Sequence, residues 1–186
     1  MKYLFICCII LISSYLYGQT SPTELDKSPM DMSYFPINYP IQRIQGKVGS
    51  TPVARVTYSR PQKKGRTIFG GEVVKYNEVW RLGANESTEI EFYQNVKIGG
   101  KKISKGRYTL YCIPSEKQWT IILNKDLNAW GAFNYDVKKD VLRTDISIQA
   151  QTDVVEVFTM YFDAIPNGAN LIMLWDNIKV VLPINV

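Results

Sequence analysis

The stretch that decides the fold covers residues 107–124 and reads RYTLYCIPSEKQWTIILN. Residues 107–113 and 118–124 are rich in β-branched and aromatic side chains and lack helical periodicity, which predicts two strands. Pro114, Ser115, Glu116 and Lys117 lie between them and are typical of a tight turn. The stretch therefore predicts an antiparallel hairpin.

The same pattern continues on both sides of this hairpin. Further strand-like runs occupy residues 43–48, 53–59, 89–96, 101–103, 142–151, 154–164, 170–175 and 178–184. Short runs separated by Gly, Asn and Asp turns predict an all-β fold, an antiparallel β-sandwich or jelly-roll-like domain with a long irregular loop after the second strand. Residues 154–162 have apolar side chains on both faces, so we expect a central strand there. Residues 126–140 are less regular and predict a long connection with a short helical turn.

The N-terminus predicts an exported protein. Lys2, an apolar run over residues 3–12 and a small residue before Gln19 are typical of a signal peptide at residues 1–18. We therefore expect a periplasmic or secreted chain with no integral membrane span after cleavage. Residues 19–40 contain four prolines (Pro22, Pro29, Pro36, Pro40) and predict an N-terminal arm or linker, and residues 41–186 predict a single domain.

Composition excludes several classes of chemistry. The sequence contains no histidine, so it has neither a Ser-His-Asp triad nor a Cys-His pair. After cleavage Cys112 is the one cysteine, which excludes an intramolecular disulfide and favours a buried hydrophobic role. We expect no metal and no cofactor. Cleavage also leaves 22 − 1 = 21 basic and 17 acidic residues, a net charge of +4. That mild charge, together with export, argues against nucleic-acid binding.

Residues 58–92 are the densest source of candidate binding residues. Arg60, Arg66 and Arg81 can form bidentate contacts with a carboxylate, phosphate or sulfate, and Asn85 and Glu86 add an amide and an acid. Two interpretations stay open: these residues line a pocket for a small anionic or carbohydrate ligand, or the arginines pair with Glu72, Glu78 and Glu86 to lock the loop.

A second candidate site is a set of carboxylates, Glu86, Glu89 and Glu91. Glu89 and Glu91 alternate along one face of a predicted strand, with side chains about 7 Å apart, close to the separation in inverting glycosidases. The alternative is the solvated face of an ordinary strand.

The tryptophans fall into two groups. Trp130 lies in the irregular connection at residues 126–140 and predicts an exposed platform on which a sugar can stack. Trp119 and Trp175 lie in strand-like runs and predict core positions.

Several motifs carry a resemblance to a known family. They are Tyr58-Ser59-Arg60-Pro61, Ile68-Phe69-Gly70-Gly71, Val79-Trp80-Arg81, Gly83-Ala84-Asn85-Glu86, Lys105-Gly106-Arg107-Tyr108 and Leu174-Trp175-Asp176. The chain resembles the bacterial family called domain of unknown function 2911. Val74-Lys75-Tyr76 departs from the family pattern, which often has a proline before the tyrosine. The resemblance implies an exported all-β protein of gram-negative bacteria, with no established activity and no catalytic residues.

These observations favour a non-catalytic binding module that takes a small anionic or carbohydrate ligand or an envelope protein partner. One alternative is a carbohydrate-active hydrolase that uses a pair of glutamates. Another is a structural component of the cell envelope that acts through strand edges such as residues 154–162.

Overall fold

The computed structural model describes residues 24–186, so the predicted signal peptide lies outside the described residues. Two antiparallel sheets form the molecule, with strand orders β1-β2-β3-β6-β7-β8 and β5-β4-β10-β9. The elements are β1 Met30–Phe35, α1 Tyr39–Ile44, β2 Ala54–Ser59, β3 Glu89–Phe92, β4 Val96–Ile98, β5 Lys101–Ile103, β6 Gly106–Pro114, β7 Gln118–Asn124, η1 Val137–Lys139, β8 Asp140–Ser147, β9 Gln149–Ile165 and β10 Gly168–Asn185. The predicted all-β sandwich is confirmed.

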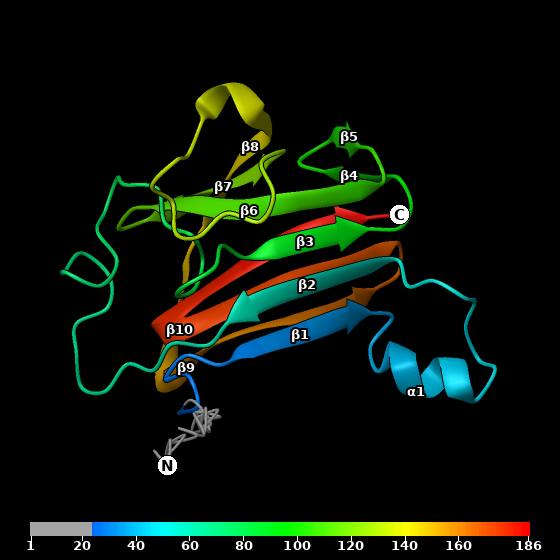
Figure 1. Cartoon of the computed structure of the whole chain (residues 1–186), viewed down its shortest axis with the longest axis horizontal. Coiled ribbons are helices and arrows are strands. Elements are labelled where there is room, and N and C mark those ends of the chain that lie inside the picture. Colours follow the sequence, from blue (N-terminus) through cyan, green and yellow to red (C-terminus); the bar gives the residue numbers. More distant parts are fainter. Residues whose placement is uncertain (1–23) are drawn as a thin grey trace, which may run out of the picture.

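The two sheets pack face to face around one apolar core. In Figure 1 the long strands β9 and β10 pass behind β1, β2 and β3. Alternate side chains of both sheets point into the core, among them Val56, Ile90, Leu110, Ile121, Phe158 and Leu171. Trp119, Trp175 and Cys112 are buried in it, as the sequence predicts. Such alternation buries one face of each sheet, which is the main favourable term in folding a sandwich.

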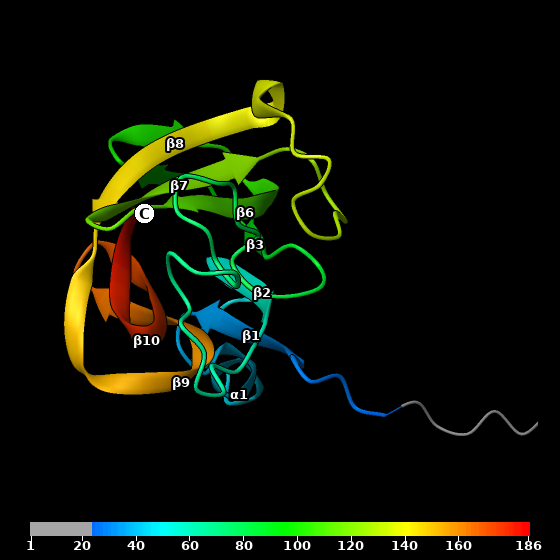
Figure 2. The same cartoon turned by 90° about the vertical axis from the view of Figure 1, so that its left-hand side faces the viewer.

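One strand-to-strand corner joins the sheets. Ile148 alone separates β8 from β9, and the chain bends there from the six-stranded to the four-stranded sheet. Figure 2 shows β8 descending into β9 at this corner. The hairpin at residues 107–124 matches β6 and β7, and β7 has the predicted bounds.

The strand predicted at residues 43–48 is wrong. Residues 43 and 44 are the last two residues of helix α1, and residues 45–48 form no strand. Pro40 occupies the first turn, where its missing N–H is tolerated, and the buried Tyr39 anchors the helix. The edge position beside β2 is taken by β1, which lies within the segment expected to be an arm and pairs with β2 along its whole length.

Two further expectations about strands are wrong. Residues 170–175 and 178–184 belong to one strand, β10, because Asp176 forms a bulge with φ 53° instead of a turn. β9 is an edge strand, not a central one. Its free edge is partly occupied, because Gln62 of a neighbouring loop forms an isolated antiparallel bridge with Val157.

That neighbouring segment is the predicted long irregular loop, residues 60–88, which we call the β2–β3 loop. It forms the left-hand end of the molecule in Figure 1. Ile68, Val74 and Leu82 are buried in the core, and Trp80 stacks on Trp175 with ring centroids 5.9 Å apart. The loop is therefore an apolar plug that closes one end of the sandwich and holds its polar residues in fixed places.

Candidate functional site

Arg60 is committed to structure. Its Nε donates to the Phe158 carbonyl (3.3 Å), its Nη1 to Asp31 Oδ2 (3.0 Å) and its Nη2 to Thr159 Oγ1 (3.0 Å). Asp31 lies on β1 and the other two acceptors on β9, so this side chain ties the edges of the two sheets together.

Arg66 also bonds within the fold. Its Nε donates to the Lys63 carbonyl (3.0 Å) and its Nη2 to the Gln62 carbonyl (2.5 Å), which closes a turn of the β2–β3 loop. Arg60 and Arg66 therefore do not converge on a common concavity. Among residues 24–186, neither pairs with Glu72, Glu78 or Glu86, so the proposed locking of the loop by those pairs is wrong.

Arg81 differs from the other two. Its Nε is buried and has no hydrogen-bond partner within the described chain. Burial lowers the pKa of the Arg81 guanidinium below its ordinary value, and no carboxylate offsets this effect. Arg81 lines a cavity of about 300 Å³ together with Val73, Trp80, Ala132 and Phe133.

Charged residues at the rim of this cavity nearly balance one another. Glu72, Lys75 and Glu78 also line it, and all three are exposed. Lys75 Nζ lies 3.6 Å from Glu78 Oε1, so these two largely neutralise each other. Arg81, in contrast, forms no ion pair within residues 24–186.

The connection between β7 and η1, residues 125–136, forms the opposite wall; we call it the β7–η1 loop. The Ser87 N–H donates to the Ala129 carbonyl and the Gly131 N–H to the Asn85 carbonyl, both at 2.9 Å. The Ser87 hydroxyl also donates to the Gly131 carbonyl. These bonds dock the loop beside residues 81–88, far away in sequence.

The docked loop presents an aromatic pair. Trp130 and Phe133 stack with ring centroids 5.9 Å apart and an interplanar angle of 19°. Their exposed fractions are 61% and 76%, so the predicted exposure of Trp130 is confirmed. Gly131 (φ 71°) permits this packing, because a Cβ there would lie 2.6 Å from the Phe133 ring.

Arg81, Asn85, Glu86, Trp130 and Phe133 together define what we call the Arg81 surface. Backbone contacts place Asn85 and Glu86 beside residues 130 and 131, whereas Arg81 is the one of the six candidate binding residues that lines the cavity. Asn85 Nδ2 already donates to Asp26 Oδ2 (3.0 Å), whereas Glu86 is exposed and forms no ion pair within residues 24–186. Phe133 was not a candidate from sequence; its spacing from Trp130 across Gly131 was the available signal.

The carboxylates of the second candidate site are largely engaged. Glu91 Oε2 accepts from Arg55 (2.7 Å) and from the Tyr93 hydroxyl (2.8 Å). Glu89 Oε2 accepts from Arg107 (3.3 Å), and its Oε1 accepts from the backbone N–H of Asn128 (2.9 Å).

Glu86 and Glu89, but not Glu91, share a second cavity. It has a volume of about 230 Å³, and Met30, Thr57 and Asn128 are among the other residues that line it. Glu91 is therefore separate from Glu86 and Glu89. Of these three carboxylates, Glu86 is the one that forms no ion pair within residues 24–186.

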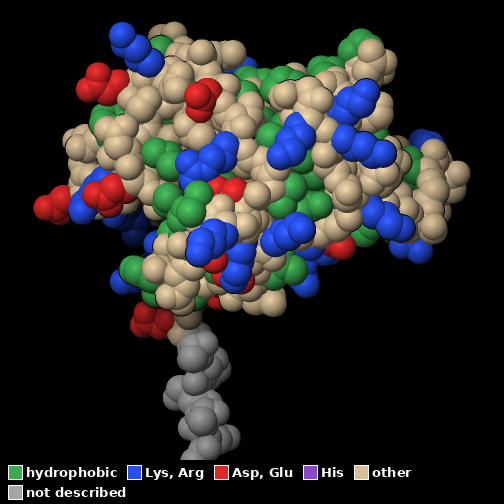
Figure 3. Space-filling model, turned by 90° about the horizontal axis from the view of Figure 1, so that it is seen from above, with side chains coloured by type: hydrophobic (Ala, Val, Ile, Leu, Met, Phe, Trp, Pro, Cys, Tyr) green, Lys and Arg blue, Asp and Glu red, His purple; other side chains and the backbone are tan. Residues whose placement is uncertain are grey.

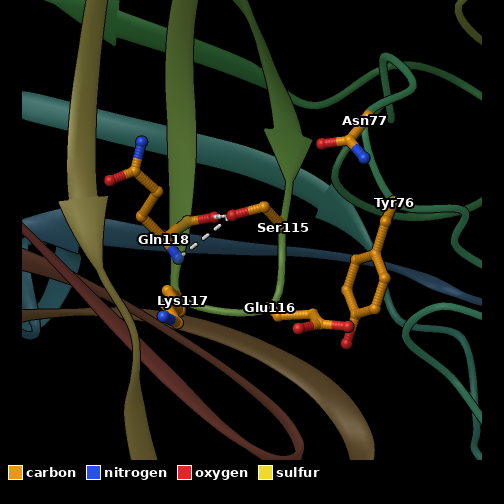
Figure 4. Close-up of a pocket in the computed structure, with 6 residues that line it drawn as sticks. All are labelled: Tyr76, Asn77, Ser115, Glu116, Lys117 and Gln118. Atoms are coloured by element: carbon orange, nitrogen blue, oxygen red, sulfur yellow. Dashed lines mark hydrogen bonds between the residues drawn. The ribbon is translucent and has the colours of Figure 1, made fainter.

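A third cavity, of about 420 Å³, lies at the β6–β7 turn. In Figure 4 the Tyr76 ring and the Glu116 side chain lie on one side of it, and Gln118 lies on the other. Ser115 Oγ donates to the Gln118 carbonyl (2.8 Å) and accepts from its N–H (3.2 Å), so these polar groups serve the turn. None of the candidate residues lies here.

Surface charge, metal ligands and membrane-spanning helices identify no further site among residues 24–186. Figure 3 shows Lys and Arg side chains spread over one face of the molecule, without a single continuous patch. Residues 24–186 contain no group of three or more Cys, Asp or Glu side chains placed to hold a metal ion. Within the same residues, no helix is long and apolar enough to cross a membrane.

Comparison with known proteins gives one match. The family described as protein of unknown function (DUF2911) matches residues 39–184. No curated protein and no solved structure matches the chain. The match spans most of the two sheets and the whole Arg81 surface, and it confirms the resemblance seen in the sequence motifs. The chain therefore belongs to the DUF2911 family of proteins of unknown function.

Proposed function

We propose that this chain is a non-catalytic, exported binding module whose Arg81 surface binds a small acidic sugar, a sugar ring that carries one carboxylate. The observation that carries the proposal is Arg81 itself. A guanidinium with a buried, unpartnered Nε lines a cavity and forms no ion pair within the described residues. A ligand carboxylate supplies that missing charge through a charge-assisted hydrogen bond.

The aromatic pair supplies the second half of the recognition. Phe133 lines the cavity with Arg81, and Trp130 extends the aromatic surface away from it. An exposed indole offers a flat apolar face to the C–H groups of a sugar ring, while the polar rim suits its hydroxyls.

The rim charges favour a ligand with a single negative charge. Glu72 lines the same cavity as Arg81, forms no ion pair within residues 24–186 and repels additional anionic groups. A monocarboxylate therefore fits this cavity better than a phosphate ester or a polysulfated chain.

Titration by NMR tests the proposal. Adding glucuronate should shift the indole resonance of Trp130, whereas glucose, which lacks the carboxylate, should bind at least about tenfold more weakly, as expected for loss of one charge-assisted hydrogen bond. Arg81→Met should remove the preference for the acid. Arg66→Met is the matched control, because it deletes the same charge from an exposed turn that is not part of the Arg81 surface. Equal effects of the two substitutions would refute the assignment.

A hydrolase is the second candidate, because Glu86 and Glu89 line one cavity. Both oxygens of Glu89 already accept hydrogen bonds, which leaves Glu86 as the available acid or base. Hydrolysis of a glycan that Glu86→Gln abolishes and Glu91→Gln leaves intact would favour this function over simple binding.

A structural role through the edge of β9 has less support. The Lys63 N–H donates to the Glu156 carbonyl (2.7 Å), and the Phe158 N–H donates to the Pro61 carbonyl (2.9 Å). The β2–β3 loop thus occupies the ladder positions in the middle of this edge, where an added strand would have to pair.

A further inference from the structure

Helix α1 projects from one end of the molecule, away from both sheets (Figure 1). One buried side chain fixes it to the domain. Tyr39 stacks on Tyr34 with ring centroids 5.9 Å apart, and its hydroxyl donates to the Gly49 carbonyl (3.2 Å). Gln42 Nε2 donates to the Ile37 carbonyl (2.6 Å), which ties the middle of the helix to the residue before its N-cap.

The helix presents an apolar stripe to solvent. Ile41 and Ile44 follow the i, i+3 spacing of one helical face, and Ile37 lies just before the N-cap residue Asn38. The exposed fractions of Ile37, Ile41 and Ile44 are 42%, 58% and 87%. A globular domain normally buries isoleucine, so three exposed isoleucines on and directly before α1 indicate a surface that is covered by something else.

The charged residues that flank these isoleucines in the sequence are basic. Between Asp31 and Arg55 the charged residues are Arg43 and Lys47. Both are exposed, and neither forms an ion pair within the described residues. Exposed apolar side chains flanked by unpaired cations are complementary to a bilayer that carries anionic headgroups.

We propose that α1 is a reversible docking element for an anionic lipid surface. Ile37, Ile41 and Ile44 enter the boundary between headgroups and acyl chains, and Arg43 and Lys47 lie at the level of the phosphates. A bilayer suits so short a helix, because insertion requires no complementary groove, whereas a stable protein interface buries about 800 Å² on each partner. This surface lies outside the Arg81 surface, and the inference is independent of the proposed ligand.

Sedimentation with vesicles tests this inference. The chain used begins at Gln19, because it keeps every described element and omits the apolar run at residues 3–12. It should sediment with phosphatidylcholine vesicles that contain about a quarter phosphatidylglycerol. With vesicles of pure phosphatidylcholine, the partition coefficient should be lower by about fivefold for each basic side chain that contacts the anionic headgroups. Raising the salt from ~0.05 M to ~0.5 M should release it, because the Debye length falls about threefold.

Two matched substitutions separate insertion from general charge effects. Ile44→Glu should reduce the apparent partition coefficient by about tenfold or more, since it removes an inserting side chain and adds a negative charge. Val154→Glu makes the same change in charge at an exposed apolar residue on β9 and should reduce it only slightly. Circular dichroism should show unchanged melting for both variants, because surface substitutions shift stability little.

Three results would overturn the inference. The first is no sedimentation with anionic vesicles at low salt. The second is an equal loss of binding in the two variants. The third is a concentration-dependent dimer, seen by light scattering, that Ile44→Glu dissolves; that result would assign the stripe to a second copy of this chain.

Discussion

Replacing Arg81 by methionine is expected to stabilise the protein. The Arg81 Nε is a buried donor without a partner, and an unsatisfied buried donor costs about 1–3 kcal/mol. Methionine is similar in length, packs against the same apolar neighbours and brings no N–H. Taking the lower end of that range, we expect a gain of about 1 kcal/mol, which corresponds to a rise in Tm of about 2–4 °C for a domain of this size.

The pH dependence of this gain has a definite sign. Burial lowers the pKa of Arg81 in the folded state, so the folded chain binds that proton less tightly than the unfolded chain. The free energy of unfolding therefore rises with pH only between the lowered pKa of the folded state and the ordinary pKa of the unfolded state. At neutral pH both states carry the proton and the penalty is present in full. The advantage of Arg81→Met should consequently be the same at pH 6 as at pH 8.

Arg60→Met is the matched comparison for this measurement. Arg60 donates three hydrogen bonds, one of them to a half-exposed carboxylate, and their loss should cost about 2 kcal/mol, or about 4–8 °C in Tm. Urea unfolding followed by tryptophan fluorescence gives both free energies, and an unchanged m-value confirms that the two folds are comparable. If Arg81→Met loses as much stability as Arg60→Met, the Arg81 guanidinium has a structural partner and the binding proposal loses its main support.

Three further outcomes follow from local geometry. Gly131→Ala should displace the Phe133 ring, weaken sugar binding and lower Tm by about 2–4 °C. Gly100→Ala is the control: this glycine also has a positive φ but has open space around it, so the substitution should lower Tm without affecting binding. Burial raises the pKa of the Cys112 thiol well above its usual range, so a thiol reagent should label it only at the rate of unfolding, and rapid labelling of the native chain would contradict this. Burial also raises the pKa of Tyr58, so the folded state holds that proton more tightly; stability should fall as pH rises above 10, and ionisation measured by ultraviolet absorbance should coincide with unfolding.

The sheet core was predictable because the relevant information is local. Along β3, Ile90 and Phe92 are buried while Glu89 and Glu91 are partly exposed, which is the alternation read from the sequence. β7 has its predicted bounds because Ser115, in the turn before it, accepts a hydrogen bond from the N–H of Gln118, the first residue of the strand. A turn signal is ambiguous elsewhere: Asp176 is a bulge in a continuous strand, and side-chain type alone does not separate a bulge from a turn.

The roles of the three arginines were not predictable, because they depend on contacts between distant segments. Arg60 finds Asp31 and Thr159, which lie 29 and 99 residues away in the chain. Arg81 finds no such partner, although the three side chains are chemically identical. The sequence therefore identified the loop and most of the Arg81 surface, whereas only the fold shows which arginine is unpaired.

The backbone beside Arg81 is itself unfavourable, and this strengthens the functional interpretation. Leu82 has φ 54° and Asn85 has φ 56°, and a left-handed conformation at a branched residue such as Leu82 costs about 1–2 kcal/mol. Leu82 is fully buried, and Trp80 Nε1 donates to the Gly83 carbonyl (3.1 Å). Packing in the core and this hydrogen bond therefore hold the backbone in its left-handed conformation. An unpaired guanidinium and strained backbone thus occur within five consecutive residues, where the apolar plug holds both in place. The proposed ligand site accounts for both features, since strain of this kind is common where binding requires a fixed geometry.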